Sequence, residues 1–546
     1  MANTQEKIAK LFPDVTIGQG NAGLELAVAD ASWHAVASAL RNDLGFDFLV
    51  TIVGMDWLEN GMGCVYYLIA TDRNECLKVK VMATGDREKP MVHSVYDLWD
   101  IATIYEREVY DYLGIIFINN PDMRRLFLNI DWKGYPLRKD YDEDPAHNPI
   151  SIKNERQTDF TESWVEKDGK IVKETHRIFQ PDDFVVNIGP QHPATHGVLR
   201  FRTAVDGETI KKIDVYLGYI HRGVEKICEK DTYAQTLHFM DRLDYFSGQN
   251  YHHCLCMLYE EAAGIEVNKR IQVIRVLMDE LSRIASHCLF IGTYCMDLGA
   301  TTMLFYALRV REQILDIFER TCGARMTFNY SCIGGVMQDL HPDFVKDVHA
   351  LLDVLPKNIR EYNTLFTGNV IAKDRMENVG VLTRDDAISW AVSGPNGRAS
   401  GWACDVRKNF PYAVYDEVDF DEIVLEEGDA MARFKVRILE MEQSARIISQ
   451  LIDSIPEGDF QVKVPKVLKI PAGHWFKMVE GCRGTFGIYL ESDGGTKPYR
   501  LKLAPPCLPA AAVVDHITEG SKIADLITIG VFAALYFVMV CIAPEP

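Results

Sequence analysis

The hydrophobic positions in the first part of the chain follow the patterns of a small α+β domain. Residues 46–53 and 64–70 are rich in β-branched, aromatic and other apolar residues, and residues 77–83 alternate as a half-buried strand does. Asn60, Gly61 and Gly63 form a turn between the first two strands. Residues 33–40 predict an early helix. We therefore predict an α+β domain over residues 1–141.

The pattern then changes to charged and turn-forming residues. Asp142, Glu143, Asp144 and Pro145 open a stretch in which charged side chains recur and few apolar ones are found. Such a composition cannot bury a core. We predict a linker over residues 142–178, followed by a second domain over residues 179–546.

This second domain is predicted to be mainly helical. Helices are expected at residues 301–321, which Gly323 ends, at 344–366, which Pro356 kinks or splits, and at 429–455. Strands and turns follow Pro456. An apolar face of a further helix is formed by Ile271, Ile274, Leu277, Met278, Leu281 and Ile284. The overall fold class is α+β, with small β elements around the helices.

One apolar stretch near the C-terminus allows two interpretations. Residues 526–543 carry no charge, and their number is about the minimum for a membrane span. The stretch has no basic flank, and Gly530 interrupts it. A buried terminal strand or helix is the favoured interpretation, and a membrane anchor is the alternative.

Composition and charge narrow the classes of function. The 546 residues suit two or three domains, and the formal net charge of −20 argues against nucleic acid as a partner. No secretory signal is recognised at the start. The 13 cysteines include no CxxC pair, which favours a reducing cytosolic compartment over a disulfide framework.

The first informative motif covers residues 105–141, YEREVYDYLGIIFINNPDMRRLFLNIDWKGYPLRKDY. By itself it predicts an amphipathic helix, a turn and a charged aromatic tail, with no catalytic constellation. Surface ion pairs, each worth little, are expected from Glu106, Arg107, Glu108, Arg124, Arg125, Arg138 and Lys139. The motif closely resembles the signature of the 30 kDa subunit of respiratory complex I.

The second motif is NIGPQHPATHGVLR, residues 187–200. His192 and His196 are four residues apart, in a stretch that its prolines and Gly197 keep from being helical. A metal site would need further ligands, and none is nearby. The histidines could transfer protons to a redox substrate or could only stabilise a turn, and the sequence leaves both possibilities open.

This second motif resembles the hallmark of the 49 kDa subunit of complex I. Further matching stretches are LGYIHRGVEKICEKDTY, MDRLDY, LMDELSRIASHCLFIGTYCMDLGATTMLFYALRVRE, ASGWACDVRKNFPY and SDGGTKPYRLK. The resemblance covers about residues 180–530. It implies the fold of a [NiFe]-hydrogenase large subunit without the metal centre.

A hydrogenase is the main competing interpretation. Its nickel and iron are held by four cysteines in two CxxC pairs. This chain has Arg242, Leu243, Asp244 and Tyr245 where the first pair should be, and Cys541 stands alone near the C-terminus. Another group of metal-binding residue types, in YHHCLCML, is interpreted as helix packing because its neighbours point in different directions. We predict no metal site.

The resemblance implies a role in quinone reduction. His196 and Tyr245 would approach the quinone, the substrate, with His192 in the same region. Asp297 would raise the pKa of the histidine and reload its proton. Arg242 would lie near an iron-sulfur cluster in an adjacent subunit, which supplies the electrons. No cofactor is expected on this chain itself, because it lacks the cysteine spacing of a cluster site.

The resemblance also implies partners. These are a cluster-bearing 20 kDa-like subunit, a ferredoxin-like subunit and a membrane subunit that forms the quinone channel. The expected place is the cytoplasmic face of the bacterial inner membrane, peripherally bound, with NADH or a ferredoxin as donor. The alternative is a non-enzymatic scaffold of a related hydrogenase-like membrane complex. Two features depart from the family, Thr327 at a usual histidine position and the apolar tail after Gly530.

Overall fold

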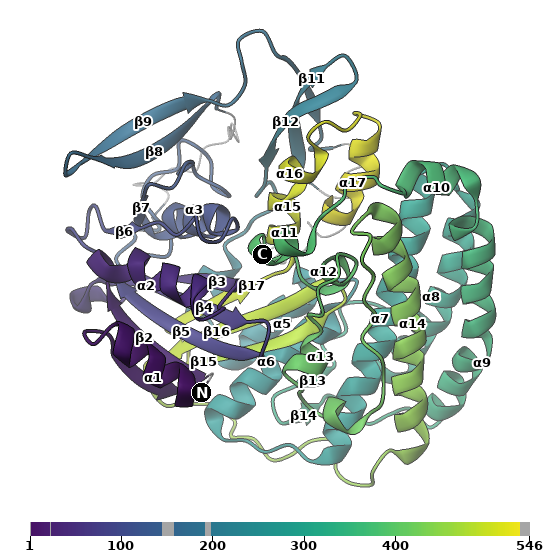
Figure 1. Cartoon of the computed structure of the whole chain (residues 1–546). Coiled ribbons are helices and arrows are strands. Elements are labelled where there is room, and N and C mark those ends of the chain that lie inside the picture. Colours follow the sequence, from purple (N-terminus) through teal and green to yellow (C-terminus); the bar gives the residue numbers. More distant parts are fainter. Residues whose placement is uncertain (1, 22, 145–157, 192–197, 535–546) are drawn as a thin grey trace.

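The computed structural model describes residues 2–21, 23–144, 158–191 and 198–534, with side chains up to Gly530 in the last range. A sheet and its helices form one side of the molecule, and a helical bundle forms the other (Figure 1). This arrangement of mixed helix and sheet confirms the α+β class.

The N-terminal part is built on a five-stranded sheet in the order β1-β2-β5-β4-β3. Strands β2 and β5 pair in parallel, and the other neighbours are antiparallel. The three predicted strands are confirmed as β3, β4 and β5, and the early helix as α2. The bounds are α1 Ala2–Leu11, β1 Thr16–Gly20, β2 Gly23–Ala29, α2 Asp30–Asn42, β3 Phe48–Asp56, β4 Met62–Ala70 and β5 Glu75–Met82.

Helix α3, Ala102–Leu113, packs directly on strand β3. A Cβ atom on Gly54 would lie 2.5 Å from a methyl group of Leu113 and 2.7 Å from one of Val109, so only glycine permits this approach. Strands β6, Met91–His93, and β7, Ile116–Ile118, pair in parallel on either side of α3 in the sequence.

The expectation of surface ion pairs in this region is wrong. Glu106, Arg107, Glu108 and Arg138 are all buried. Glu106 accepts hydrogen bonds from Ser94 Oγ at 2.5 Å and from the backbone N–H of Val95 at 2.9 Å. The polar residues of α3 are buried because other parts of the chain cover every face of the helix, which its own periodicity does not reveal.

The described part of the predicted linker contains a hairpin that the sequence did not predict. Strands β8, Phe160–Lys167, and β9, Lys170–Arg177, pair over their full length and project from the molecule (Figure 1). The domain boundary itself stays a prediction. A three-stranded sheet follows, made of β10 Phe184–Ile188, β11 Arg200–Asp206 and β12 Thr209–Tyr216.

The helical side is confirmed. Gly323 ends α8 in the left-handed conformation at φ +80°, as predicted. Pro356 was predicted to kink the helix or to split it in two. It lies inside α9, which runs on to Tyr362, so the helix is not split. The helices are α4 Val224–Lys230, α5 Tyr233–Leu243, α6 Gly248–Ala263, α7 Lys269–Asp297, α8 Thr302–Cys322, α9 Phe344–Tyr362, α10 Val370–Met376, α11 Arg384–Ser389, α12 Gly394–Arg398, α13 Val406–Asn409 and α14 Ala430–Leu451.

The strands expected after Pro456 form a sheet of β15 Gly473–Gly481, β16 Gly484–Ser492 and β17 Arg500–Ala504. This sheet lies against the N-terminal one: the rings of Tyr67 and Phe476 stack at 4.0 Å, and the Trp57 indole N–H donates to Glu491 at 2.8 Å. One continuous hydrophobic core therefore runs through both parts of the chain.

Short helices end the described chain, α15 Cys507–Ala512, α16 Val514–Thr518 and α17 Asp525–Ala534. In α17, Leu526 and Ile529 are buried, and the Tyr294 hydroxyl of α7 donates to the Thr528 carbonyl at 3.1 Å. The start of the apolar stretch is thus a packed helix, and its remainder from residue 535 lies outside the described residues. No described helix is both long and apolar enough to span a membrane.

Candidate functional site

The connection between α5 and α6, residues 244–247, places Tyr245. A capping box starts α5, in which the Thr232 side chain accepts from the backbone of Gln235 and the Gln235 side chain accepts from that of Thr232. Helix α6 starts at Gly248, where a Cβ would lie 2.8 Å from the backbone of Asp241. The two helices therefore approach closely, and the chain between them must turn sharply.

The Asp244 carboxylate fixes this turn. It is fully buried and accepts from Ser247 Oγ at 2.5 Å and from the Phe246 N–H at 3.2 Å. The guanidinium of Arg483, from the turn between β15 and β16, lies 2.8 Å from the same carboxylate. Arg483, which is 239 residues from Asp244 in the sequence, thus holds the segment that carries Tyr245 in place.

Tyr245 faces a narrow crevice of about 20 Å³. Its ring packs against Phe246 at a centroid distance of 4.0 Å. Burial raises the pKa of Tyr245, Asp244 raises it further, and Arg483 and Arg311 oppose the shift. The phenol is therefore protonated at neutral pH. The walls come from α5, α6, α7, α8 and the loop after α8, through residues such as Asp241, Gln249, Ser282, Ala285, Arg311, Met326 and Thr327.

Thr327, the position that departs from the family pattern, thus lines the same crevice as Tyr245, with its backbone in the left-handed region at φ +49°. Arg242 lies on α5 and donates to the His238 carbonyl at 2.7 Å. Asp297 is the last residue of α7 and half-buried.

The structure does not bring all predicted site residues together. Ala285 lines the crevice, and Asp297 follows it by about 18 Å along α7 at the usual helical rise. Neither Asp297 nor Arg242 lines the crevice of Tyr245. His192 and His196 lie outside the described residues. Among the predicted site residues that the structure describes, Tyr245 is therefore the one that lines the crevice.

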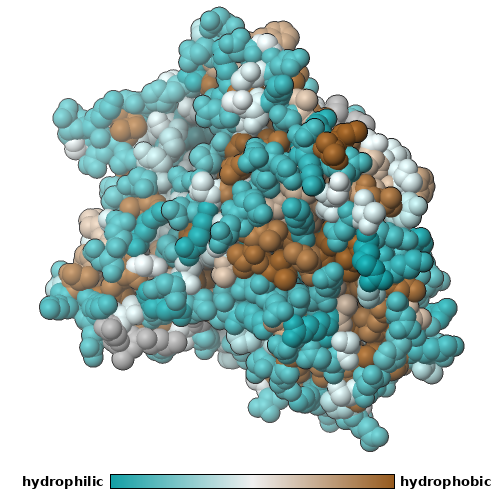
Figure 2. Space-filling model, turned by 45° about the vertical axis from the view of Figure 1, so that its right-hand side comes forward, coloured by the Kyte–Doolittle hydropathy of each residue, from teal (hydrophilic) through white to brown (hydrophobic). Residues whose placement is uncertain are grey.

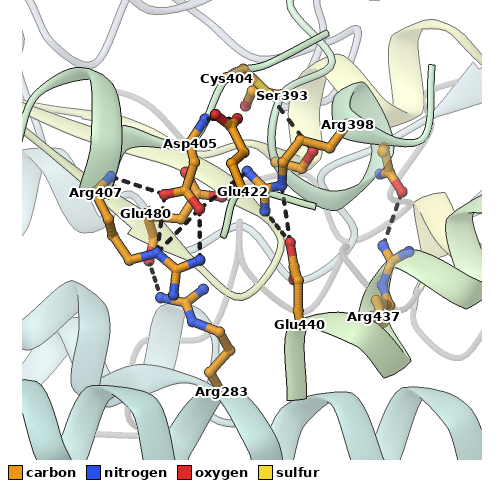
Figure 3. A network of polar contacts seen from close by, with 12 residues as sticks. Arg283, Ser393, Arg398, Cys404, Asp405, Arg407, Glu422, Arg437, Glu440 and Glu480 are labelled. Carbon is orange, nitrogen blue, oxygen red and sulfur yellow. Dashed lines mark hydrogen bonds and ion pairs between the residues drawn. The ribbon is translucent and has the colours of Figure 1, made fainter. Parts of the chain in front are cut away.

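A buried network of ion pairs reaches the end of β15, next to the turn that carries Arg483. Figure 3 shows this network. Arg283 of α7 donates to the carbonyls of Glu480 and Gly481 at 2.8 and 3.1 Å. Arg398 Nη1 lies 2.9 Å from Glu480, and its Nε lies 3.0 Å from Glu440. Arg407 bridges Asp405 at 2.6 Å and Glu280 at 3.0 Å. The network fixes the hairpin turn that holds Asp244.

The network lowers the pKa values of some of its carboxyl groups and leaves that of another raised. Burial by itself would raise the pKa of Glu280, but the charges of Arg283 and Arg407 outweigh burial, and the pKa is lowered to about 2. Asp405 behaves in the same way, with a pKa lowered to about 2 by Arg407 and Arg398. For Glu480 burial dominates and raises the pKa to about 7 despite Arg398. Sequence reasoning missed this network, because the helices and strands that it joins are far apart in the chain.

A cavity of about 520 Å³ lies elsewhere, at the junction of the N-terminal part with the rest. Its apolar walls include Phe127, Trp132 and Leu508, and it meets α5 at Leu243. A hydrogen bond of 2.6 Å joins the Tyr112 hydroxyl to His221 Nε2 on its wall. Of the predicted site residues that the structure describes, Arg242, Tyr245 and Asp297, none lines it.

The potential metal-binding residue types of YHHCLCML lie in helix α6 and are buried. His253 Nδ1 lies 2.6 Å from Asp279, which gives it a partner other than a metal. Among the described residues no group of three or more histidine, cysteine, aspartate or glutamate side chains could hold a metal ion.

Comparisons with known proteins agree with the motifs. Residues 26–146 match the model of the 30 kDa subunit of respiratory-chain NADH dehydrogenase, and residues 297–542 match that of its 49 kDa subunit. The chain is 53% identical to the fused C/D subunit of NADH-quinone oxidoreductase from Phocaeicola vulgatus, over 91% of this chain and 95% of that protein. It is 51% identical to the C/D subunit from Bacteroides thetaiotaomicron, over 92% and 97% of the two chains. The D subunit of the same enzyme from Dehalococcoides mccartyi is 45% identical over 66% of this chain and 97% of its own length.

Proposed function

Because the chain belongs to the family of fused C/D subunits of NADH-quinone oxidoreductase, complex I, we propose that its second half forms part of the site where quinone is reduced. The chain is thus an oxidoreductase subunit that works with other complex I subunits. We further propose that the second half has the fold of a [NiFe]-hydrogenase large subunit without its metal centre.

The observation that carries the proposal is the placement of Tyr245. Reduction of a quinone to a quinol takes two electrons and two protons, so the site needs proton donors at the quinone oxygens. The phenol of Tyr245 faces a crevice, on a turn that Asp244 and Arg483 hold in place. Its raised pKa keeps the proton on the oxygen until negative charge develops on the quinone.

The remaining roles follow the family pattern. His196, with His192 in the same region, would be the second donor, and Asp297 would tune the pKa of His196 and reload its proton. Electrons would come from an iron-sulfur cluster in the 20 kDa-like neighbour, near Arg242. No cofactor would be bound by this chain.

The further partners proposed are a ferredoxin-like subunit and a membrane subunit that forms the quinone channel, at the cytoplasmic face of the bacterial inner membrane. A scaffold that has lost the quinone chemistry is the second candidate. The retention of both His196 and Tyr245 favours the enzymatic role.

The test is quinone-dependent turnover of assembled complexes. Tyr245→Phe keeps the ring and removes the proton that the phenol can donate, and His196→Ala removes the imidazole. Each change is expected to reduce quinone turnover roughly 10²-fold, the scale for loss of one donor to a developing oxyanion. Asp297→Asn should cost less.

The control is turnover with an artificial acceptor that takes electrons before the quinone site. This activity should survive in all three variants, because the electron path upstream is intact. Near-normal quinone turnover in Tyr245→Phe would show that the assigned role of this residue is wrong.

A further inference from the structure

Arg311 of α8 is a mostly buried cation that faces the same crevice as Tyr245. Its side chain is 12% exposed, and it lines the crevice together with Tyr245 and Phe246. Burial lowers the pKa of its guanidinium, which means that the site favours the charged form less than water does. Such a residue needs compensation from a negative charge.

Two other buried arginines, Arg275 and Arg407, have close acidic partners, whereas the carboxylate nearest to Arg311 among the described residues lies 3.9 Å away. Arg275 has a Glu260 oxygen at 2.6 Å, and Arg407 has an Asp405 oxygen at 2.6 Å. Within the described part of the chain, Arg311 has the thioether sulfur of Met326 at 3.2 Å and a Glu312 oxygen at 3.9 Å.

A thioether is a weak acceptor. Glu312 is 54% exposed and is itself paired with Arg325. The positive charge of Arg311 is therefore only partly balanced in the resting state.

The charges around Tyr245 indicate which negative charge could balance that of Arg311. Asp244 raises the pKa of the phenol, whereas Arg311 and Arg483 lower it. Arg483 is already neutralised by its pair with Asp244 at 2.8 Å. Arg311 is thus the cation in this set whose charge remains available when negative charge appears on the phenol oxygen.

We propose that Arg311 stabilises the phenolate that forms when Tyr245 gives its proton to the quinone. In this step the O–H bond of Tyr245 breaks and an O–H bond forms on the quinone oxygen, while the electrons come from the neighbouring subunit's cluster. The phenolate then takes a proton from water or from His196. This inference rests on the proposed function of Tyr245, and Arg311 acts through that residue.

The test is a double-mutant cycle in the assembled complex. Arg311→Gln is made in the natural chain and in the Tyr245→Phe background, and quinone turnover is measured beside artificial-acceptor turnover. We expect Arg311→Gln to reduce kcat about tenfold in the natural chain, with KM little changed. In the Tyr245→Phe background it should have almost no further effect, since no phenolate can form.

Two variants serve as controls. Arg311→Lys keeps the charge and should restore most of the turnover. Arg309→Gln is the second control. Arg309 lies on the same helix, two residues from Arg311, and its side chain is 49% exposed and pairs with Glu361 of α9. This substitution should leave quinone turnover within about twofold, as expected for an exposed pair.

The outcomes distinguish the proposed role of Arg311 from the proposed role of Tyr245. An equal loss from Arg311→Gln in both backgrounds, or no loss in the natural chain, would overturn the role of Arg311 and leave that of Tyr245 intact. Near-normal turnover in Tyr245→Phe alone would overturn both. Should Arg311→Gln prevent assembly, judged by artificial-acceptor turnover, Arg311→Met, which also removes the charge, is compared in the same two backgrounds. An equal loss in both would again overturn the inference.

Discussion

Asp244 illustrates how one buried carboxylate can define the position of a functional neighbour. It combines two contacts within its own turn with an arginine that is 239 residues away. The motif MDRLDY indicated that Tyr245 matters, through its resemblance to a known family. It could not reveal that Arg483 holds the motif in place, because no local pattern relates residues so distant in the sequence.

Asp244→Asn is expected to destabilise the protein. It leaves the buried Arg483 without its carboxylate, which typically costs about 3–5 kcal/mol of unfolding free energy. Chemical unfolding of the chain measures the effect. The control is Asp453→Asn, which removes an exposed partner of His349, with side chains 68% and 46% exposed. If both variants lose the same small amount, the pair of Asp244 with Arg483 contributes little.

At the scale of elements, periodic patterns in the sequence predict helices and strands that bury one face and expose the other. Strand β5 and helix α7 were recognised because apolar positions recur with a clear period, and strands β3 and β4 because they are rich in β-branched and aromatic residues. Helix α6 was not outlined in this way, because it is buried on nearly all sides, polar residues such as His253 included. The hairpin β8–β9 was missed because most of its residues are exposed and polar.

Helix α7 joins the crevice to the ionic network. Ser282 and Ala285 line the crevice, and Arg283 between them points to the turn that ends β15. Adjacent residues on a helix point in different directions, so a single helix can serve both places. The ion pairs that join different elements, Arg398 of α12 with Glu440 of α14 and Arg407 of α13 with Glu280 of α7, are 42 and 127 residues apart, beyond the reach of any periodic pattern.

The network predicts a loss of stability in acid. Glu280 has a pKa of about 2 in the folded chain instead of 4.5, and Asp405 about 2 instead of 3.8. A carboxyl whose pKa is lowered by folding contributes stability above its unfolded pKa, and this is lost as the pH falls through the folded pKa. The unfolding free energy should therefore fall from about pH 4.5 towards pH 2.

Glu280→Gln tests the origin of this effect. At neutral pH the variant should be less stable by about 3–5 kcal/mol, because Arg283 and Arg407 lose a shared carboxylate. The difference from the natural chain should narrow in acid, where the natural carboxylate becomes protonated too. Urea unfolding across this pH range measures both, with the exposed Asp421→Asn as control. A difference that stays constant with pH would contradict the assignment.

At the scale of the whole molecule, the two halves form one body. Arg124 of the N-terminal half pairs with Asp214 at 3.0 Å, and Lys502 pairs with the buried Glu108 at 2.5 Å. These contacts join segments that sequence analysis assigned to separate domains. Figure 2 shows apolar side chains at several places on a mainly hydrophilic face, and exposed apolar residues include Phe305, Val370 and Ile371, each about 70% exposed.

The shared core predicts that the halves associate without a covalent link. Residues 1–144 and 158–546, produced together as two chains, should purify as a stable pair, because the contact buries aromatic rings and charged pairs. Arg124→Ala should weaken the pair by leaving Asp214 uncompensated, whereas Lys173→Ala, 48% exposed, should not. Separate elution of the unmodified halves would contradict this expectation.

The covalent connection between the halves has a consequence for how this interface tolerates change. Tethering turns their encounter into an intramolecular event, with an effective concentration on the order of millimolar. Dilution therefore cannot separate the halves, and their ratio is fixed at one to one by translation. A substitution that weakens the contact of Arg124 with Asp214 would be largely masked in this chain, whereas the same weakening between two untethered subunits would appear as dissociation.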